Sequence, residues 1–271
     1  MNKPLKWAAL ALAAALPVAA SAHKTFLVPS TTVLSDGNDA WITVDAAVSN
    51  DLFYFNHVPL ALDNLAITAP DGSRVAPENA STGKWRSTFD VHMTQQGTYR
   101  IAIASEGLFA SYETAKGEKK RARGSAETLA KQIPADARNV AVTQFDNRVE
   151  TFATLGKPTE AVFKPSGKGL EFVPVTHPND LFAGEAATFR FLVDGKPAAG
   201  LKVSVVQGGT RYRNKQDEIA ATTDAGGKVS VTWPAAGLYW LNATVEGAKP
   251  TLKDAKERRM GYTATLEVLP Q

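Results

Sequence analysis

The chain has 271 residues, of which 44% are hydrophobic, 21% are charged and none is cysteine. A mean hydropathy of −0.17 excludes a polytopic membrane protein. The lack of cysteine excludes disulfide scaffolds, zinc ribbons and thiolate catalysis. The length suffices for one large domain or two ordinary ones, each with its own core.

Residues 1–22 have the features of a secretory signal peptide. Lys3 and Lys6 precede a short apolar stretch, and Ala-Ser-Ala at 20–22 fits a cleavage site. The stretch is too short to span a bilayer comfortably, which favours a cleaved leader over an uncleaved anchor. Cleavage removes two lysines and no acids, so the formal net charge falls from +3 to +1. So small a positive charge does not indicate a nucleic-acid partner. The sequence therefore predicts a periplasmic protein.

The rest of the chain has the pattern of β structure. Short segments rich in Val, Ile, Thr and aromatic residues alternate in polarity and are separated by turn pairs such as Asp-Gly. This spacing is typical of β-sandwiches. We therefore predict an all-β protein with two Ig-like or prealbumin-like β-sandwich domains. The expected strands lie at 40–48, 64–68, 87–93, 98–104, 187–193, 201–206, 228–233, 238–245 and 262–268.

Two segments, 91–99 and 231–239, resemble each other. Each is a strand, a short turn that ends in glycine, and a second strand with tyrosine at its second position. We interpret each as the closing hairpin of an Ig-like module. The two copies favour one sandwich in each half of the chain.

The segment between the halves has a different composition. Residues 116–124 are basic and predict a solvated loop, with docking to an acidic partner or an anionic membrane as the alternative. Ser125 fits the N-cap of a short helix over 126–132, which Pro134 ends. The expected organisation is a signal peptide (1–22), an N-terminal sandwich with the candidate metal site (23–115), a connection of basic loop, short helix and strands (116–168), and a C-terminal sandwich (169–271).

Motifs of common enzymes are absent from the sequence. It contains no nucleophile elbow, no phosphate-binding glycine loop and no His-Glu-x-x-His, so we expect a protein that is not an enzyme and has no small organic substrate.

Cleavage after Ala22 has a chemical consequence, because it makes His23 the N-terminal residue. Its free α-amine and its imidazole Nδ1 can then chelate one metal ion.

The other three histidines, His57, His92 and His177, are not equally good candidates for metal ligands. Strand alternation places Asp90 and His92 on the face opposite buried Phe89, Val91 and Met93. His92 and Asp90 are therefore either a metal-binding pair or a solvated histidine beside an acid.

His57 follows the aromatic stretch 53–55 and precedes a proline. It is either a ligand backed by a hydrophobic shell or a buried histidine bonded to the backbone. His177, which precedes Pro178, is expected to be structural.

A site built from His23, His57 and His92 would offer three imidazoles and one amine. Such nitrogen-rich sets suit Cu(II), Ni(II) or Co(II), and a carboxylate from Asp90 or Asp51 would admit iron. We therefore predict that the cofactor or cargo is a divalent transition metal.

Several short motifs resemble those of a known family. They are HKTFLVP at 23–29, TYR at 98–100, Leu-x-x-Gly at 181–184, Gly-Lys-Pro-x-x-Gly at 195–200, Asp-x-x-Gly at 224–227 and Gly-Leu-Tyr-Trp at 237–240. This set is similar to a bacterial periplasmic family of formally unknown function, whose members are often labelled nickel-uptake or NikM-like proteins. The resemblance implies a secreted, β-rich protein of transition-metal import, chiefly nickel or cobalt. Its implied partner is a membrane metal transporter or a TonB-dependent receptor system.

Three functions remain open from the sequence. The first is a periplasmic metal-binding accessory protein. The second is a cell-envelope module without metal, in which Trp41, Trp85, Trp233 and Trp240 contact glycan or protein. The third is a copper protein with a histidine brace, in which the terminal histidine and one other histidine hold the metal.

Overall fold

The computed structural model describes residues 23–35, 37 and 39–271, and the signal peptide predicted at 1–22 lies outside this range. The described chain forms three β-sheets. Its helices are short: α1 (Ala126–Gln132) and the 3-10 turns η1 (Ala161–Phe163) and η2 (Thr210–Tyr212). The prediction of an all-β protein is thus confirmed. Across this range, no helix is both long and apolar enough to cross a membrane.

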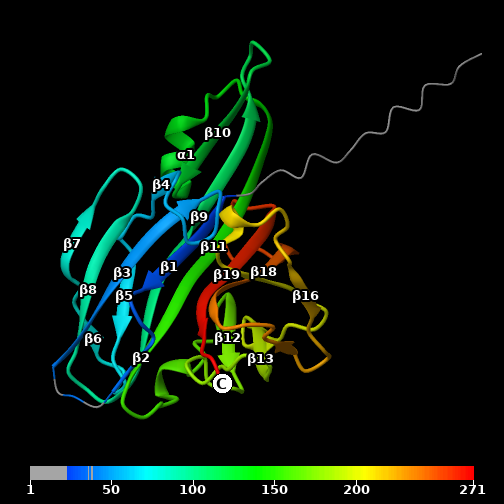
Figure 1. The fold of residues 1–271 in the computed structure, drawn as a ribbon. Coiled ribbons are helices and arrows are strands. Elements are labelled where there is room, and N and C mark those ends of the chain that lie inside the picture. The colour runs from blue at the N-terminus through cyan, green and yellow to red at the C-terminus, as the bar shows by residue number, and fades with distance from the viewer. Residues whose placement is uncertain (1–22, 36, 38) are drawn as a thin grey trace, which may run out of the picture.

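The first sandwich packs a small sheet against part of a large one (Figure 1). The small sheet has the strand order β1-β3-β8-β7, and β4 pairs with β3 as well. In β8, Phe89, Val91 and Met93 are fully buried and the residues between them are not, as the period of two predicts. The strands are β1 (Lys24–Pro29), β3 (Ala40–Ser49), β4 (Val58–Pro59), β7 (Glu78–Thr82) and β8 (Ser87–Met93).

A ten-stranded sheet runs through both halves of the chain. Its order is β16-β15-β18-β19-β11-β9-β5-β6, with β10 beside β9 and β2 beside β11. The strands are β2 (Val33–Leu34), β5 (Leu65–Thr68), β6 (Arg74–Val75), β9 (Gly97–Glu113), β10 (Lys119–Gly124), β11 (Arg138–Leu155), β15 (Lys202–Gln207), β16 (Ile219–Thr222), β18 (Gly237–Ala248) and β19 (Glu257–Val268). Because β11 pairs in parallel with β19, the two sandwiches share this sheet.

The second sandwich covers the other end of the large sheet. A third sheet, of order β12-β13-β14 with β17 beside β13, packs on β15, β18 and β19. Its core contains fully buried Phe189, Trp233 and Tyr262. The strands are β12 (Leu170–Pro174), β13 (Ala186–Val193), β14 (Lys196–Pro197) and β17 (Lys228–Thr232).

The repeated segments at 91–99 and 231–239 form corners between sheets, so the prediction of hairpins was wrong. The strand before each turn belongs to a small sheet and the strand after it belongs to the large sheet. Tyr99 Oη accepts a hydrogen bond from Gln95 N at 2.8 Å, and Tyr239 Oη donates one to Ala235 O at 2.8 Å. This is the tyrosine-corner arrangement of Ig-like sandwiches. Alternation and a glycine turn occur in hairpins and corners alike, so the pattern could not separate the two.

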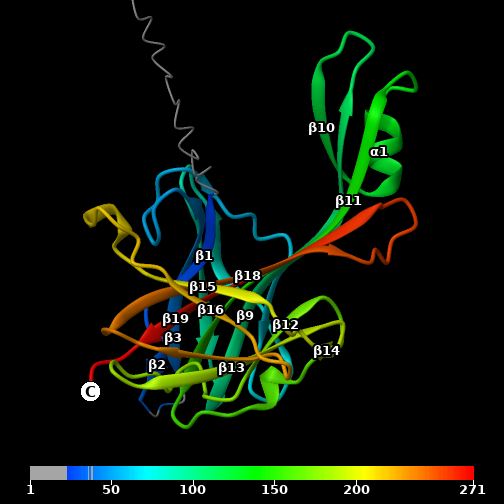
Figure 2. The same cartoon turned by 90° about the vertical axis from the view of Figure 1, so that its right-hand side faces the viewer.

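The connecting segment forms an arm that projects beyond the sandwiches (Figure 2). The basic stretch was expected to be a loop, but most of it is β10, which pairs with the distal part of β9. Ser125 caps α1 as predicted, accepting a hydrogen bond from Thr128 N at 3.2 Å. Leu129 of α1 packs against Leu108 and Ala122. A single apolar residue at 122 therefore suffices to anchor a strand whose other face is charged.

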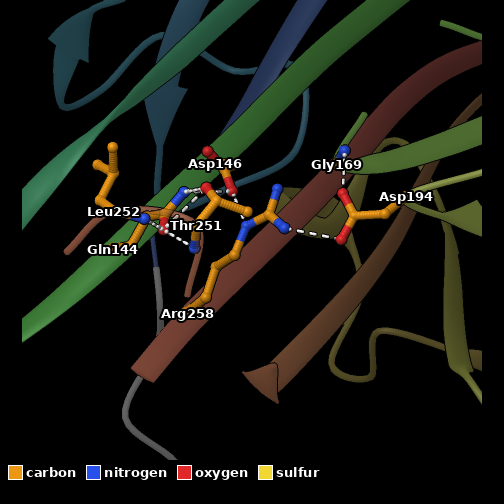
Figure 3. A network of polar contacts seen from close by, with 7 residues as sticks. All are labelled: Gln144, Asp146, Gly169, Asp194, Thr251, Leu252 and Arg258. Carbon is orange, nitrogen blue, oxygen red and sulfur yellow. Dashed lines mark hydrogen bonds and ion pairs between the residues drawn. The ribbon is translucent and has the colours of Figure 1, made fainter. Parts of the chain in front are cut away.

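A polar network ties the base of the arm to the second sandwich (Figure 3). The buried guanidinium of Arg258 bonds to Asp146 and, at 2.8 Å, to Asp194. The Gln144 side chain accepts a hydrogen bond from Thr251 N at 2.8 Å. The connection between β18 and β19 is thereby fixed to β11.

Candidate metal centre

His23 and His57 lie together at one end of β3. His23 immediately precedes β1 and His57 immediately precedes β4. These strands pair with the two edges of the same part of β3, with Lys24 opposite Ser49 and Val58 opposite Val48. The two imidazole rings stack with their centroids 3.9 Å apart and their planes 6° from parallel. The fold therefore brings together two of the predicted metal ligands.

The loop before His57 is held by contacts within itself and with the second half. Asn56 Oδ1 accepts a hydrogen bond from Asn50 N at 3.2 Å, and Asn56 Nδ2 donates to Asp51 at 3.0 Å. Leu52 is buried against the second half, and its backbone N–H donates to Thr210 Oγ1 at 3.1 Å. These contacts fix the path of the chain into His57.

Lys24, the residue after His23, has polar contacts with the second half of the chain. Lys24 Nζ donates to Gln216 Oε1 at 3.0 Å. Burial lowers the pKa of Lys24, and the nearby carboxylates of Asp51 and Glu218 partly oppose that shift. Asp51 is in turn 3.9 Å from Arg211 Nη1, so its carboxylate already has a cation and an amide as neighbours.

The stacked pair can supply nitrogen donors, but only after one ring turns. The lone pair of an imidazole nitrogen lies in the plane of its ring, so two parallel rings direct their lone pairs side by side. His23 is exposed, and rotation of its side chain is unhindered by a core. If the predicted leader is cleaved after Ala22, the chain offers the α-amine and Nδ1 of His23 and one nitrogen of His57.

His92 lies far from this pair. It is opposite Trp41, and the stretch of β3 from Trp41 to Ser49 spans about 25 Å at the usual rise of a strand. The His92 ring stacks on Trp41 with centroids 4.1 Å apart, and its Nε2 is 2.8 Å from Asp39 Oδ1. The structure does not bring His92 to His23.

Asp90 is on the same face as His92 and is bonded to protein groups. It accepts hydrogen bonds from Thr43 Oγ1 at 2.6 Å and Asn79 Nδ2 at 2.8 Å, and these bonds lower its pKa. Over residues 23–35, 37 and 39–271, no three His, Cys, Asp or Glu side chains form a group that could hold a metal. The α-amine that the predicted cleavage would give His23 is a donor outside that set of side chains.

His177 lies at the junction of the halves, where Thr98 Oγ1 and Asn179 N are 2.9 and 3.1 Å from its ring nitrogens. Burial lowers its pKa. These contacts give His177 a role in packing the two halves together.

The four tryptophans considered for a contact surface do not form one. Trp233 is fully buried, and Trp240 is half-buried with its Nε1 donating to Thr25 O at 3.0 Å. Trp41 and Trp85 remain 43% and 45% exposed, but Trp41 is stacked on His92.

Comparisons with known proteins give a family and remote structural likenesses. No curated protein matches the chain. The D0-D1 domain of Intimin is 14% identical, with 90% of this chain and 97% of that chain covered and a TM-score of 0.24. The Yersinia pseudotuberculosis adhesin InvE is 13% identical, with 92% and 61% covered and a TM-score of 0.22. The model of the family described as "Domain of unknown function (DUF4198)" matches residues 20–247, so the chain belongs to that family.

Proposed function

We propose that the processed protein is a periplasmic accessory protein that binds a divalent transition metal for uptake. The proposed ligands are the α-amine and imidazole of His23 and the imidazole of His57. The supporting observation is the 3.9 Å separation of the two ring centroids. A membrane metal transporter or a TonB-dependent receptor system is the proposed partner.

The donor set guides the choice of metal. Three nitrogens and no carboxylate favour Cu(II) and Ni(II) over iron. His92 and Asp90 are left out of the proposed site, because the length of β3 separates them from His23. Nickel or cobalt is the cargo suggested by the resemblance of the sequence motifs, and the description of the matched family names no metal.

The experiment is a calorimetric titration of the processed protein, beginning at His23, with NiCl₂ and CuCl₂. The comparison is the same protein with its N-terminal amine acetylated, which removes one donor and breaks the chelate ring. We expect acetylation to weaken binding at least about tenfold, as loss of a direct ligand should. Equal affinity of the two forms would show that the amine is not a ligand and would overturn the proposal.

A copper protein with a histidine brace is the second candidate. It is favoured by the observation that a single further histidine, His57, lies against His23, which matches the two-histidine set of that class. Copper-loaded protein that consumes oxygen in the presence of a reductant and a glycan would favour this candidate. Nickel binding without oxygen consumption would favour the accessory protein.

A further inference from the structure

A trough crosses the large sheet where the small sheet of the first sandwich ends. It has a volume of about 670 Å³ and is lined by the ends of β1 and β3, the middle of β9 and β11, and parts of β10, β18 and β19. In Figure 2 this part of the large sheet lies between β1 and the projecting arm. Its principal polar and aromatic side chains are Arg123, Phe145, Asn147, Asn242 and Arg259.

Two arginine side chains, those of Arg123 and Arg259, face the trough together with one carboxylate, Asp63. Arg148 also lines it, but strand alternation turns its side chain to the opposite face of β11 from Phe145 and Asn147. Arg148 is paired with buried Glu150 at 3.2 Å. Burial lowers the pKa of Arg148, but Glu150, Tyr262 and Glu171 together outweigh burial and the net shift is upward. Arg259 forms an exposed ion pair with Glu246 at 2.9 Å. Breaking an exposed ion pair costs little free energy.

Arg123 is the guanidinium that is free to bind a ligand. Its carbon Cζ lies 4.0 Å from the centroid of the Phe145 ring, and it has no ion-pair partner among the residues that the structure describes. Stacking on an aromatic face holds the guanidinium plane without using its N–H donors. A ligand in the trough can therefore accept hydrogen bonds from it.

Two glycines lie directly against side chains that line the trough, and one of them, Gly261, also lines it. Gly107 is opposite Phe145 and Gly261 is opposite Asn147 in the strand register. A Cβ at Gly107 would lie 3.0 Å from Phe145 Cζ, and a Cβ at Gly261 would lie 2.6 Å from Asn147 Oδ1. Both side chains therefore occupy space that a larger residue would fill. A glycine within a strand marks this kind of close approach.

We propose that this trough binds a carboxylate-bearing, hydroxyl-rich ligand, with Arg123 as the principal carboxylate contact. A guanidinium pairs with a carboxylate through two parallel hydrogen bonds. The amides of Asn64 and Asn147, which line the trough, both donate to and accept from hydroxyl groups. Asn242 Nδ2 already donates to Tyr262 O and Thr263 Oγ1, so Asn242 offers a ligand only its Oδ1 acceptor. Acidic sugar units of a glycan and free small hydroxy acids share this chemistry.

The experiment is a titration of metal-free processed protein with trigalacturonate, citrate, maltotriose and inorganic phosphate. We expect trigalacturonate or citrate to bind and neutral maltotriose not to bind. Tighter binding of trigalacturonate identifies a glycan as the source of the carboxylate, and tighter binding of citrate identifies a free acid. Absence of binding by both, or equal binding by phosphate, would overturn the proposal.

Two variants locate the ligand and two serve as controls. Arg123→Gln and Gly261→Ala should each weaken binding at least about tenfold, since the first removes charged hydrogen bonds and the second displaces Asn147. Lys84→Gln, at the exposed turn between β7 and β8, is the matched loss of a cation outside the trough and should have no effect. Equal affinities of Arg123→Gln and the unmodified protein would contradict the assignment. His57→Ala should bind the carboxylate normally, so this test is independent of the proposed metal centre.

Discussion

Thr98 Oγ1 and His177 Nε2 are 2.9 Å apart and join the first strand after one tyrosine corner to the start of the second sandwich. Because His177 Nδ1 accepts a hydrogen bond from Asn179 N at 3.1 Å, the ring proton of the neutral form is on Nε2 and points to Thr98. A second proton would face the N–H of Asn179. The neutral ring is therefore the form that fits this junction.

This contact predicts a loss of stability in mild acid. Burial lowers the pKa of His177 below its usual 6.5 in the folded protein, so the unfolded chain binds more protons as the pH falls past that value. The free energy of unfolding should therefore keep its full value above about pH 7 and decrease as the pH falls toward 5. Urea unfolding at pH 7.5, 6.5 and 5.5 measures it. His177→Gln should flatten the decline and His92→Gln should preserve it, and an unchanged decline in His177→Gln would refute this explanation.

The histidine pair predicts unequal effects of two substitutions on metal binding. His57→Ala in the processed protein should weaken Cu(II) or Ni(II) binding at least about tenfold, because it removes a direct ligand. His92→Ala is the matched control and should leave the affinity unchanged, since His92 contacts Asp39 and Trp41 instead. Calorimetry on both variants decides the matter. Equal losses would mean that His92 reaches the metal in solution.

The two tyrosine corners predict similar and additive losses of stability. Tyr99→Phe removes the acceptor of Gln95 N, and Tyr239→Phe removes the donor to Ala235 O. Each should lower the free energy of unfolding by about 1 kcal/mol. The tyrosines lie in separate cores, so the double variant should equal the sum to within about 0.5 kcal/mol. Urea unfolding of the three variants measures these losses. If the two corners were coupled, the loss in the double variant would differ from the sum of the single losses by more than this amount.

Adjacent arginines in β19 should differ sharply in their effect on stability. Arg258→Ala leaves Asp146 without its cation in a largely buried site and should cost about 3 kcal/mol. Arg259→Ala breaks only the exposed pair with Glu246 and should cost less than about 1 kcal/mol. Chemical denaturation of both variants gives the comparison. A small loss for Arg258→Ala would show that the network in Figure 3 is not stabilising.

Local signals in the sequence were enough to predict many elements. The alternation at 87–93 gives the observed bounds of β8, and Ser125 begins a helix with the predicted bounds of α1. Alternation and capping depend on neighbours within a few residues, so one sequence contains the needed information.

Relationships between distant segments could not be predicted in this way. The parallel register of Thr143 with Glu257 and the hydrogen bond from Leu52 to Thr210 depend on how strands meet in space. The same limit applies to the candidate site. The sequence supplied four ligand candidates, but only the pairing of β1 and β4 with β3 shows that His57 joins His23 and that His92 does not.

The parallel pairing of β11 with β19 has a consequence for the order of folding. Thr143 and Glu257, which face each other across it, are 114 residues apart in the chain. During synthesis from the N-terminus, β11 emerges long before its neighbour exists, and one of its edges has unpaired backbone groups until then. Such edges promote association between chains, and distant pairing slows folding. Pairing with β19 therefore covers this edge of β11 and ends the period in which its backbone groups are open to other chains.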